Sequence, residues 1–139
     1  MKLNEIFTRS VVTARPEETL AAVALRMQKH NVGTVVIVEE QRPVGIVTDR
    51  DLALALGARR VSPQTEVQKV MTRHVLAIPE DTGIYTATKF MREREVRRLP
   101  IVDREDHLVG IVTLDDLLQF LGRELYNLAE GIKQEMEIK

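Results

Sequence analysis

The alternation of apolar and polar stretches along this chain predicts a strand, a helix, a hairpin of two strands and a second helix, in that order. A short apolar run at residues 10–14 predicts the first strand, and a continuous apolar run at 34–39 predicts the second. Polar residues separate this run from a third strand at 44–48, as in a hairpin. Between the first two strands, apolar residues at helical spacing share one face: Leu20, Val23, Ala24 and Met27.

The same series of elements recurs in the second half of the chain. Thr8 has its counterpart 64 residues later in Thr72, and one extra residue in the second hairpin changes this offset to 65. The phrase Gly-Ile-Val-Thr-x-x-Asp-Leu therefore occurs at 45–52 and again at 110–117. The predicted strands of the second copy are 74–78, 99–103 and 109–113. The apolar face of its first helix comprises Ile84, Ala87, Thr88 and Met91.

The ends of the predicted helices carry their usual residues. Thr19 and Thr82 lie near the start of the first helix of each copy. Gly57 and Gly122 follow the second helix of each copy, and we expect them to act as C-terminal caps.

A single copy of about 55 residues buries too little apolar surface to be secure alone. We therefore expect an α/β (α+β) domain in which two β-α-β-β-α repeats pack with their sheets back to back and with pseudo-twofold symmetry. Residues 1–70 would form the first repeat with its N-terminal segment and linker, and 71–122 the second repeat. Residues 123–139 would form a C-terminal helical extension. The linker near 58–70 would cross between the repeats.

The composition excludes several classes of function. A net charge of -1 gives no general attraction for nucleic acid, and 4% aromatic residues provide few platforms for stacking bases. Without cysteine there is no disulfide framework and no thiolate site. The first twenty residues lack the apolar core of a signal peptide, and no later run is long enough to cross a bilayer. We therefore expect a cytoplasmic protein that does not enter a membrane.

The repeated Thr-x-x-Asp motif has two interpretations. Thr48 with Asp51, and Thr113 with Asp116, match a capping box in which each side chain caps the start of a helix. The same helix start also suits a nucleotide, because free backbone N–H groups attract phosphate and a carboxylate accepts hydrogen bonds from a ribose diol. The spacing alone does not decide between them. No GxGxxG or Walker sequence indicates ordinary dinucleotide or kinase-type binding.

The order of motifs resembles a tandem pair of CBS (cystathionine-beta-synthase) domains, also called a Bateman module, over about residues 1–122. The resemblance rests on "PEETL" and "PEDTG", on the helices ending at Met27 and Met91, on "VRRLPIVD", and on "GIVTDRDL" with "GIVTLDDL". It implies a non-catalytic regulatory module that binds an adenosine compound: AMP, ADP, ATP, NAD or S-adenosylmethionine. No cofactor is implied.

The resemblance also implies which residues would bind the ligand. Thr48 and Asp51, and Thr113 and Asp116, would hold ribose and phosphate oxygens. Arg97 and Arg98 fall where related repeats carry a basic pair near the phosphate, although they could instead end a solvated helix of mixed charge. The opening strands would border the adenine: Val12, Thr13 and Ala14 in the first copy, and Leu76, Ala77 and Ile78 in the second.

The first copy departs from this pattern. It has Gly33-Thr34 in place of the two arginines, which favours one better phosphate site. The sequence does not indicate which repeat's Thr-x-x-Asp motif shares the arginines.

Other residues that could carry chemistry have simpler explanations. His30, His74 and His107 are isolated, with no partner at ligand spacing, so no metal site is expected. Asp49, Asp51, Asp115 and Asp116 lack an accompanying nucleophile or base, and capping or ribose binding explains them more simply than catalysis. We expect no enzyme activity.

The chain ends in an amphipathic segment. The apolar residues of this segment form one helical stripe: Leu121, Leu125, Leu128, Ile132 and Met136. The stripe could cover its own domain, or it could pair with a second copy in a homodimer.

The sequence therefore supports a stand-alone homodimeric sensor, which binds an adenine nucleotide between its repeats and signals to an unknown effector protein by a change of shape. The alternative is a ligand-independent dimeric scaffold in which the Thr-x-x-Asp motifs are only caps. Nucleic-acid binding rests on the basic cluster from Lys89 to Arg98 alone and is poorly supported.

Overall fold

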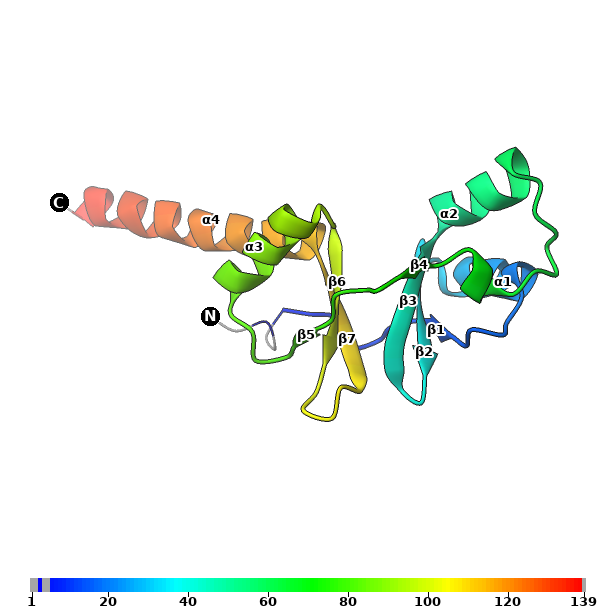
Figure 1. Cartoon of the computed structure of the whole chain (residues 1–139). Helices are drawn as coiled ribbons and strands as arrows, with labels where there is room; N and C mark the ends of the chain where they lie inside the picture. Colours follow the sequence, from blue (N-terminus) through cyan, green and yellow to red (C-terminus); the bar gives the residue numbers. More distant parts are fainter. Residues whose placement is uncertain (1–2, 4–5, 139) are drawn as a thin grey trace.

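A computed structural model describes Leu3 and residues 6–138, and it places the elements in the predicted order (Figure 1). The first repeat contains β1 (Thr13–Ala14), α1 (Leu20–His30), β2 (Thr34–Glu39), β3 (Arg42–Thr48), α2 (Asp49–Ala53) and the π-helical turn η2 (Leu54–Ala58). The linker contains the short 3₁₀ turn η3 (Val67–Lys69) and β4 (Thr72–Arg73). The second repeat contains β5 (Ile78–Pro79), α3 (Ile84–Arg94), β6 (Arg98–Val102), β7 (Leu108–Thr113) and α4 (Leu114–Ile138). The predicted fold class, with two repeats and a C-terminal helix, is confirmed.

Each repeat forms one small sheet, and the two sheets lie between the helices of the two repeats (Figure 1). In the first sheet β1 runs parallel to β2, and β2 and β3 form the predicted antiparallel hairpin. In the second sheet β5, β6 and β7 are related in the same way. Each pair of helices therefore covers the outer face of its own sheet, as the apolar periodicity of α1 and α3 requires.

The segment that precedes each repeat pairs with the sheet of the other repeat. Thr8, before the first repeat, forms an antiparallel bridge with Ile111 of β7, with N···O distances of 3.0 and 2.9 Å. The equivalent strand β4, before the second repeat, pairs with β3. The two repeats are thus interlocked. The expected domain boundaries at residues 70 and 122 stay predictions. In the structure, the segment before each repeat packs against the sheet of the other repeat.

The molecule has two separate apolar cores, and each contains residues from the segment that precedes the other repeat. Val67, from the linker, is fully buried in the first core beneath α1 and α2. Leu3 and Phe7, from the N-terminal segment, are buried in the second core beneath α3 and α4. The predicted helix faces are confirmed by the burial of Leu20, Val23 and Met27 in α1 and of Ala87 and Met91 in α3.

The predicted glycine caps are wrong. Helix α4 continues through Gly122 to Ile138, and no described glycine has a positive φ. The helices that do end in a left-handed residue end at Asn31 and Glu95, with φ of 52° and 54°. At the other end of α1, Thr19 is the N-cap, and its hydroxyl accepts a hydrogen bond from the N–H of Ala22 at 3.1 Å.

No helix in the described part of the chain is long and apolar enough to span a membrane.

An ion pair between Glu18 and Arg26 holds the opening of the first repeat together. The Arg26 guanidinium donates to both carboxylate oxygens of Glu18, and it also donates to the carbonyl oxygen of Thr13 at 2.8 Å. The carboxylate accepts a further hydrogen bond, from the N–H of Arg15 at 2.6 Å. The hydrogen bonds from Arg26 are the main cause that lowers the pKa of Glu18, and the pKa of Arg26 is raised in return.

Glu18→Gln should lower the free energy of unfolding by about 1 kcal/mol at neutral pH, because it weakens a charge-assisted pair that is about two-thirds buried. Since the pKa of Glu18 is lower in the folded state, this contribution is present above the unfolded pKa and is lost as the pH falls through the folded pKa. Urea unfolding at pH 7 and pH 3 should therefore show a difference from the wild type that shrinks in acid. Glu17→Gln is the control, because the pair of Glu17 with Arg15, at 3.6 Å, is exposed. An equal loss of stability in both variants would contradict the prediction.

Candidate functional site

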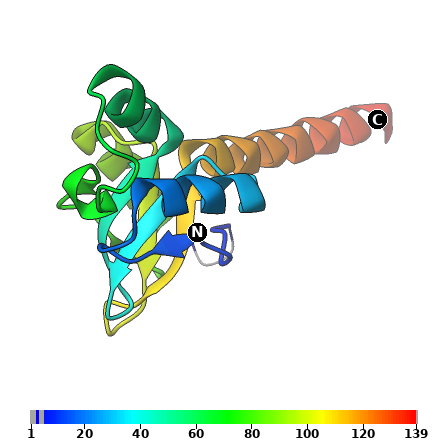
Figure 2. The same cartoon turned by 90° about the vertical axis from the view of Figure 1, so that its right-hand side faces the viewer.

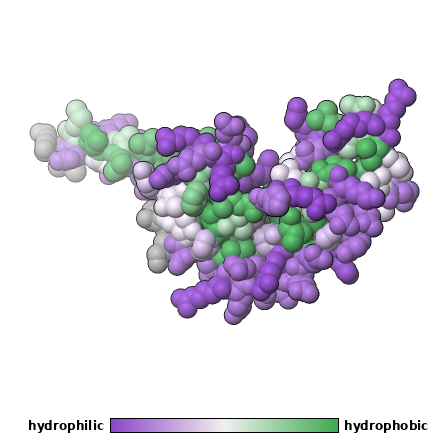
Figure 3. Space-filling view, in the orientation of Figure 1, coloured by the Kyte–Doolittle hydropathy of each residue, from purple (hydrophilic) through white to green (hydrophobic). Residues whose placement is uncertain are grey.

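A cleft of about 320 Å³ lies between the two repeats. It is enclosed by the end of β3, by β4 and the residues that follow it, and by the turn between α3 and β6 (Figure 1). Figure 3 shows the surface hollowed between the repeats, with hydrophilic residues on both rims. The lining residues are Ile46, Thr48, Thr72, His74, Val75, Leu76, Arg94, Val96, Arg97, Arg98 and Leu99.

Thr48 enters the cleft as the last residue of β3 and the N-cap of α2. Its hydroxyl accepts a hydrogen bond from the N–H of Asp51 at 3.2 Å, and its own N–H donates to Asp51 Oδ2 at 2.9 Å. Thr113 and Asp116 form the same box at the start of α4, at 3.1 and 3.0 Å. The capping interpretation is therefore confirmed for both motifs.

The capping box does not use every polar atom of Asp51. Oδ2 is occupied by the N–H of Thr48, whereas Oδ1 has no hydrogen bond to the described part of the chain. The Thr48 hydroxyl accepts in the box, which leaves its proton available for donation to a ligand. Capping and ligand binding can therefore coexist at the same two residues.

The structure brings Arg97 and Arg98 of the second repeat to the same cleft as Thr48 of the first. Thr113 is the β-ladder partner of Arg98, but of the two motif threonines only Thr48 is among the residues that line the cleft. Arg97 is mostly exposed, and its ion pair with Asp115 is a long contact of 4.0 Å. Its guanidinium is thus held only weakly and can reach a bound anion.

Two further basic residues line the cleft that the sequence analysis did not select. Arg94 lies at the end of α3, and His74 lies directly after β4 with a left-handed φ of 56°. No carboxylate is among the lining residues of the cleft. Arg94 could have been identified from the sequence, because it lies close to the Arg97-Arg98 pair. His74 could not, because only the pairing of β4 with the sheet of the first repeat brings it to the cleft.

Apart from Leu76, the other predicted ligand-binding residues, Asp51 among them, do not line this cleft. Ala14 and Ile78 are buried in the two cores, and the carbonyl oxygen of Thr13 accepts a hydrogen bond from Arg26. Of the strand expected to border the adenine in the second repeat, Leu76 lines the cleft. The remaining positions stay predictions: Val12, Ala77, Thr113 and Asp116.

The corresponding turn of the first repeat has the opposite charge. Gly33 stands where the second repeat has Arg97, and the Asp49 carboxylate packs against it: a Cβ on Gly33 would lie 3.0 Å from Asp49 Oδ2. The N–H of Asp49 donates to the carbonyl oxygen of Gly33 at 2.9 Å. An anionic group is therefore favoured at the arginine-lined cleft and disfavoured beside Asp49.

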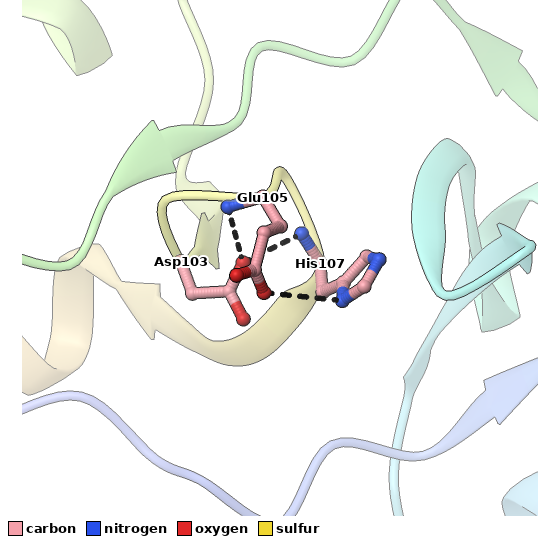
Figure 4. Close-up of side chains that lie close together, drawn as sticks. All are labelled: Asp103, Glu105 and His107. Atoms are coloured by element: carbon pink, nitrogen blue, oxygen red, sulfur yellow. Dashed lines mark hydrogen bonds and ion pairs between the residues drawn. The ribbon is translucent and has the colours of Figure 1, made fainter.

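The hairpin between β6 and β7 brings together Asp103, Glu105 and His107, as Figure 4 shows. One ligand atom from each lies within 4.8 Å of the others, a set that could hold a metal ion. The prediction that His107 is isolated is therefore wrong. The alternating Asp-x-Glu-x-His spacing in the loop was the signal for this cluster.

The hairpin also explains the cluster without a metal ion. Asp103 Oδ1 accepts hydrogen bonds from the N–H groups of Glu105 and His107 at 2.9 and 3.0 Å. The hydrogen bond from His107 is the main cause that lowers the pKa of Asp103. The carboxylate of Asp103 thus shapes the turn.

Comparisons with known proteins agree with the duplicated architecture. A family model described as the CBS domain matches residues 3–58 and again residues 67–123. Uncharacterized protein MK0525 of Methanopyrus kandleri is 37% identical over 139 residues, which cover 99% of this chain and 71% of that protein. The CBS domain-containing protein YhcV of Bacillus subtilis is 37% identical over 115 residues, which cover 83% of this chain and 81% of YhcV.

A solved structure shares the whole arrangement. The CBS domain pair of protein MJ0100, in complex with 5′-methylthioadenosine and S-adenosyl-L-methionine, matches with a TM-score of 0.79 and 28% identity. The match covers 89% of this chain and 98% of that one.

Proposed function

Because the chain belongs to the CBS domain family and carries the domain twice, we propose that it is a regulatory module that binds an adenosine-containing nucleotide in the cleft between its repeats. One observation carries this proposal: Thr48 of one repeat and the Arg97-Arg98 pair of the other converge on the same cleft. A ligand there would touch both repeats at once.

The lining of the cleft suits the three parts of such a nucleotide. Thr48 lines the cleft, and its capping-box partner Asp51, which is not among the lining residues, has a free Oδ1; together they match the hydroxyl groups of a ribose. Arg94, Arg97 and Arg98 match a phosphate group, and apolar residues such as Val75 and Leu76 match a base. The adenosine compounds in the MJ0100 domain pair support the adenosine part of this assignment. The arginines favour a ligand with phosphate, such as AMP, ADP, ATP or NAD, over S-adenosylmethionine with its positive sulfonium.

The proposed mechanism is a shift between relative orientations of the repeats. A ligand held by both repeats stabilises the orientation in which Thr48 and the arginines contact it together, and the shift equals its difference in affinity for the two orientations. An effector protein that contacts both repeats, or both copies of a homodimer, would detect this change. The module would not be an enzyme, since no nucleophile with a positioned base lines the described cleft.

The alternative is a scaffold that binds no ligand. The complete capping boxes of Thr48 and Thr113 favour it, because they show that both motifs stabilise helix starts without a nucleotide.

Thermal unfolding with AMP, ADP, ATP, NAD and S-adenosylmethionine tests the proposal. A ligand at about one hundred times its dissociation constant should raise the free energy of unfolding by about 2.7 kcal/mol. We expect this rise with at least one of the phosphate-bearing compounds. Asp51→Ala should cost about 1 kcal/mol of stability through its lost cap and should also abolish the rise.

Asp116→Ala is the matched control, because it removes the same capping box at Thr113, which does not line the cleft. It should cost a similar amount of stability and leave the response to nucleotide intact. A wild-type protein that responds to none of the five compounds would contradict nucleotide binding and leave the scaffold as the better explanation. A response that Asp51→Ala leaves unchanged would contradict the ribose contact assigned to Asp51.

A further inference from the structure

Helix α4 extends far beyond the body of the molecule, as Figures 1 and 2 show from two sides. Its first turns pack on the second repeat, where Leu117 is 1% exposed. Beyond them the helix stands free of the rest of the chain, and every described residue from Leu121 to Ala129 is exposed. The interpretation in which this segment covers its own domain is therefore wrong.

A second apolar face of α4 is left uncovered. Five of its large apolar residues lie 3, 4, 3 and 4 residues apart and are 42 to 67% exposed: Leu118, Leu121, Leu125, Leu128 and Ile132. We call these five residues the α4 seam. Figure 3 shows hydrophobic residues along the free part of the helix. A 3-4 spacing is the pattern of a helix that packs lengthwise against another helix.

We infer that the α4 seam pairs with the α4 seam of a second copy of this chain, in a two-stranded coiled coil. The inference specifies the contact surface of the homodimer proposed above, and it does not depend on whether the cleft binds a nucleotide. A helix of 25 residues with a straight 3-4 stripe fits a partner helix of similar length and spacing, and a second α4 supplies both.

The residues beside the seam favour such self-pairing. Gly122, Ala129 and Gly131 flank it, and a Cβ added at either glycine would meet nothing within 4 Å. Nothing in the described part of the chain therefore requires glycine at these positions, although glycine weakens a helix. Small flanking residues let two helix backbones come close together.

The charges of α4 agree with the same partner. Arg123, Glu130, Lys133 and Glu137 lie on the side of the helix opposite the seam, and Glu124 is the one charged residue that flanks it between Leu118 and Ile132. In a parallel pair, the residue facing Glu124 would be Ala129 of the second copy, so between Leu118 and Ile132 self-pairing brings no like charges together. Covering five large side chains on each helix buries on the order of 1,000 Å² in total, which reaches the lower range of specific interfaces.

The mass of the purified full chain in solution, measured by light scattering without nucleotide, tests this inference. We expect a dimer of twice 15.8 kDa at micromolar concentrations. Leu125→Lys/Leu128→Lys should raise the dissociation constant of the dimer by at least about 100-fold, because both substitutions put charge into the centre of the seam. Gln119→Lys/Asn127→Lys adds the same charge to the opposite side of the same helix and should leave the dimer unchanged.

Both double variants should retain the wild-type circular dichroism, since all four side chains are exposed. A monomeric wild-type protein would overturn the inference, and the seam would then face a different protein. A dimer that survives in Leu125→Lys/Leu128→Lys would also overturn it, because the contact would then lie elsewhere. Neither result would bear on nucleotide binding, which the thermal shift measures separately.

Discussion

Replacing Gly110 by alanine should lower the free energy of unfolding by about 2–3 kcal/mol, an amount typical of severe overpacking. A Cβ at this position of β7 would lie 2.2 Å from the ring of Phe7 and 2.7 Å from the carbonyl oxygen of Thr8. The backbone oxygen cannot move away without breaking the bridge between Thr8 and Ile111. The N-terminal segment would therefore separate from the second sheet and expose Phe7. Urea unfolding of the purified variant measures the loss.

Two further alanine substitutions make this prediction specific. Gly45→Ala, at the equivalent position of β3, would bring its Cβ 2.3 Å from the sulfur of Met71, and a flexible methionine side chain can rotate away. We expect a loss of about 1 kcal/mol there. Gly122→Ala has open space around it in α4 and should be neutral or stabilising by up to about 1 kcal/mol. Equal losses at Gly110 and Gly45 would show that the N-terminal segment is not held as the structure describes.

The double variant Arg97→Ala/Arg98→Ala should bind a phosphate-bearing adenosine compound about 100-fold more weakly than the wild type. Two charge-assisted hydrogen bonds of about 1.5 kcal/mol each account for a loss of this size. Isothermal titration calorimetry with the nucleotide that gives the strongest thermal shift measures it. The stability of the unliganded protein should change little, since Arg97 is exposed and its ion pair with Asp115 is long.

Two controls separate a phosphate contact from a general effect of charge. Arg92→Ala/Arg104→Ala removes the same charge from exposed positions outside the cleft and should leave the affinity unchanged. Adenosine without phosphate should lose little affinity for the Arg97→Ala/Arg98→Ala variant. If the variant binds the nucleotide as well as the wild type does, the arginines are part of a solvated helix end and the ligand assignment is wrong.

Much of the fold could be predicted because its elements depend on contacts between near neighbours in the sequence. The periodicity of α1, the hairpin of β2 with β3 and the capping box of Thr48 and Asp51 each involve residues a few positions apart. The duplication could also be predicted, since it requires only an alignment of the sequence with itself.

The predictions that were wrong depend on the tertiary surroundings of a helix or hairpin. Gly122 is a common helix terminator, yet α4 passes through it without a left-handed turn. A glycine ends a helix only where the chain must turn, and here the chain continues straight away from the body (Figure 2). His107 was predicted to have no partner at ligand spacing, whereas the tight hairpin brings it to Asp103 and Glu105.

The sequence by itself determined the two repeats, the class of the fold, the capping boxes at the starts of α2 and α4 and the residue types available for a ligand. Only the tertiary structure decided which of these residues meet. Thr48 and Arg98 are 50 positions apart, and they share a cleft because the linker and the N-terminal segment exchange sheets. Such an exchange depends on long-range packing of Phe7 and Val67 into opposite cores. A local pattern contains no information on that choice, since each segment would be equally apolar in either core.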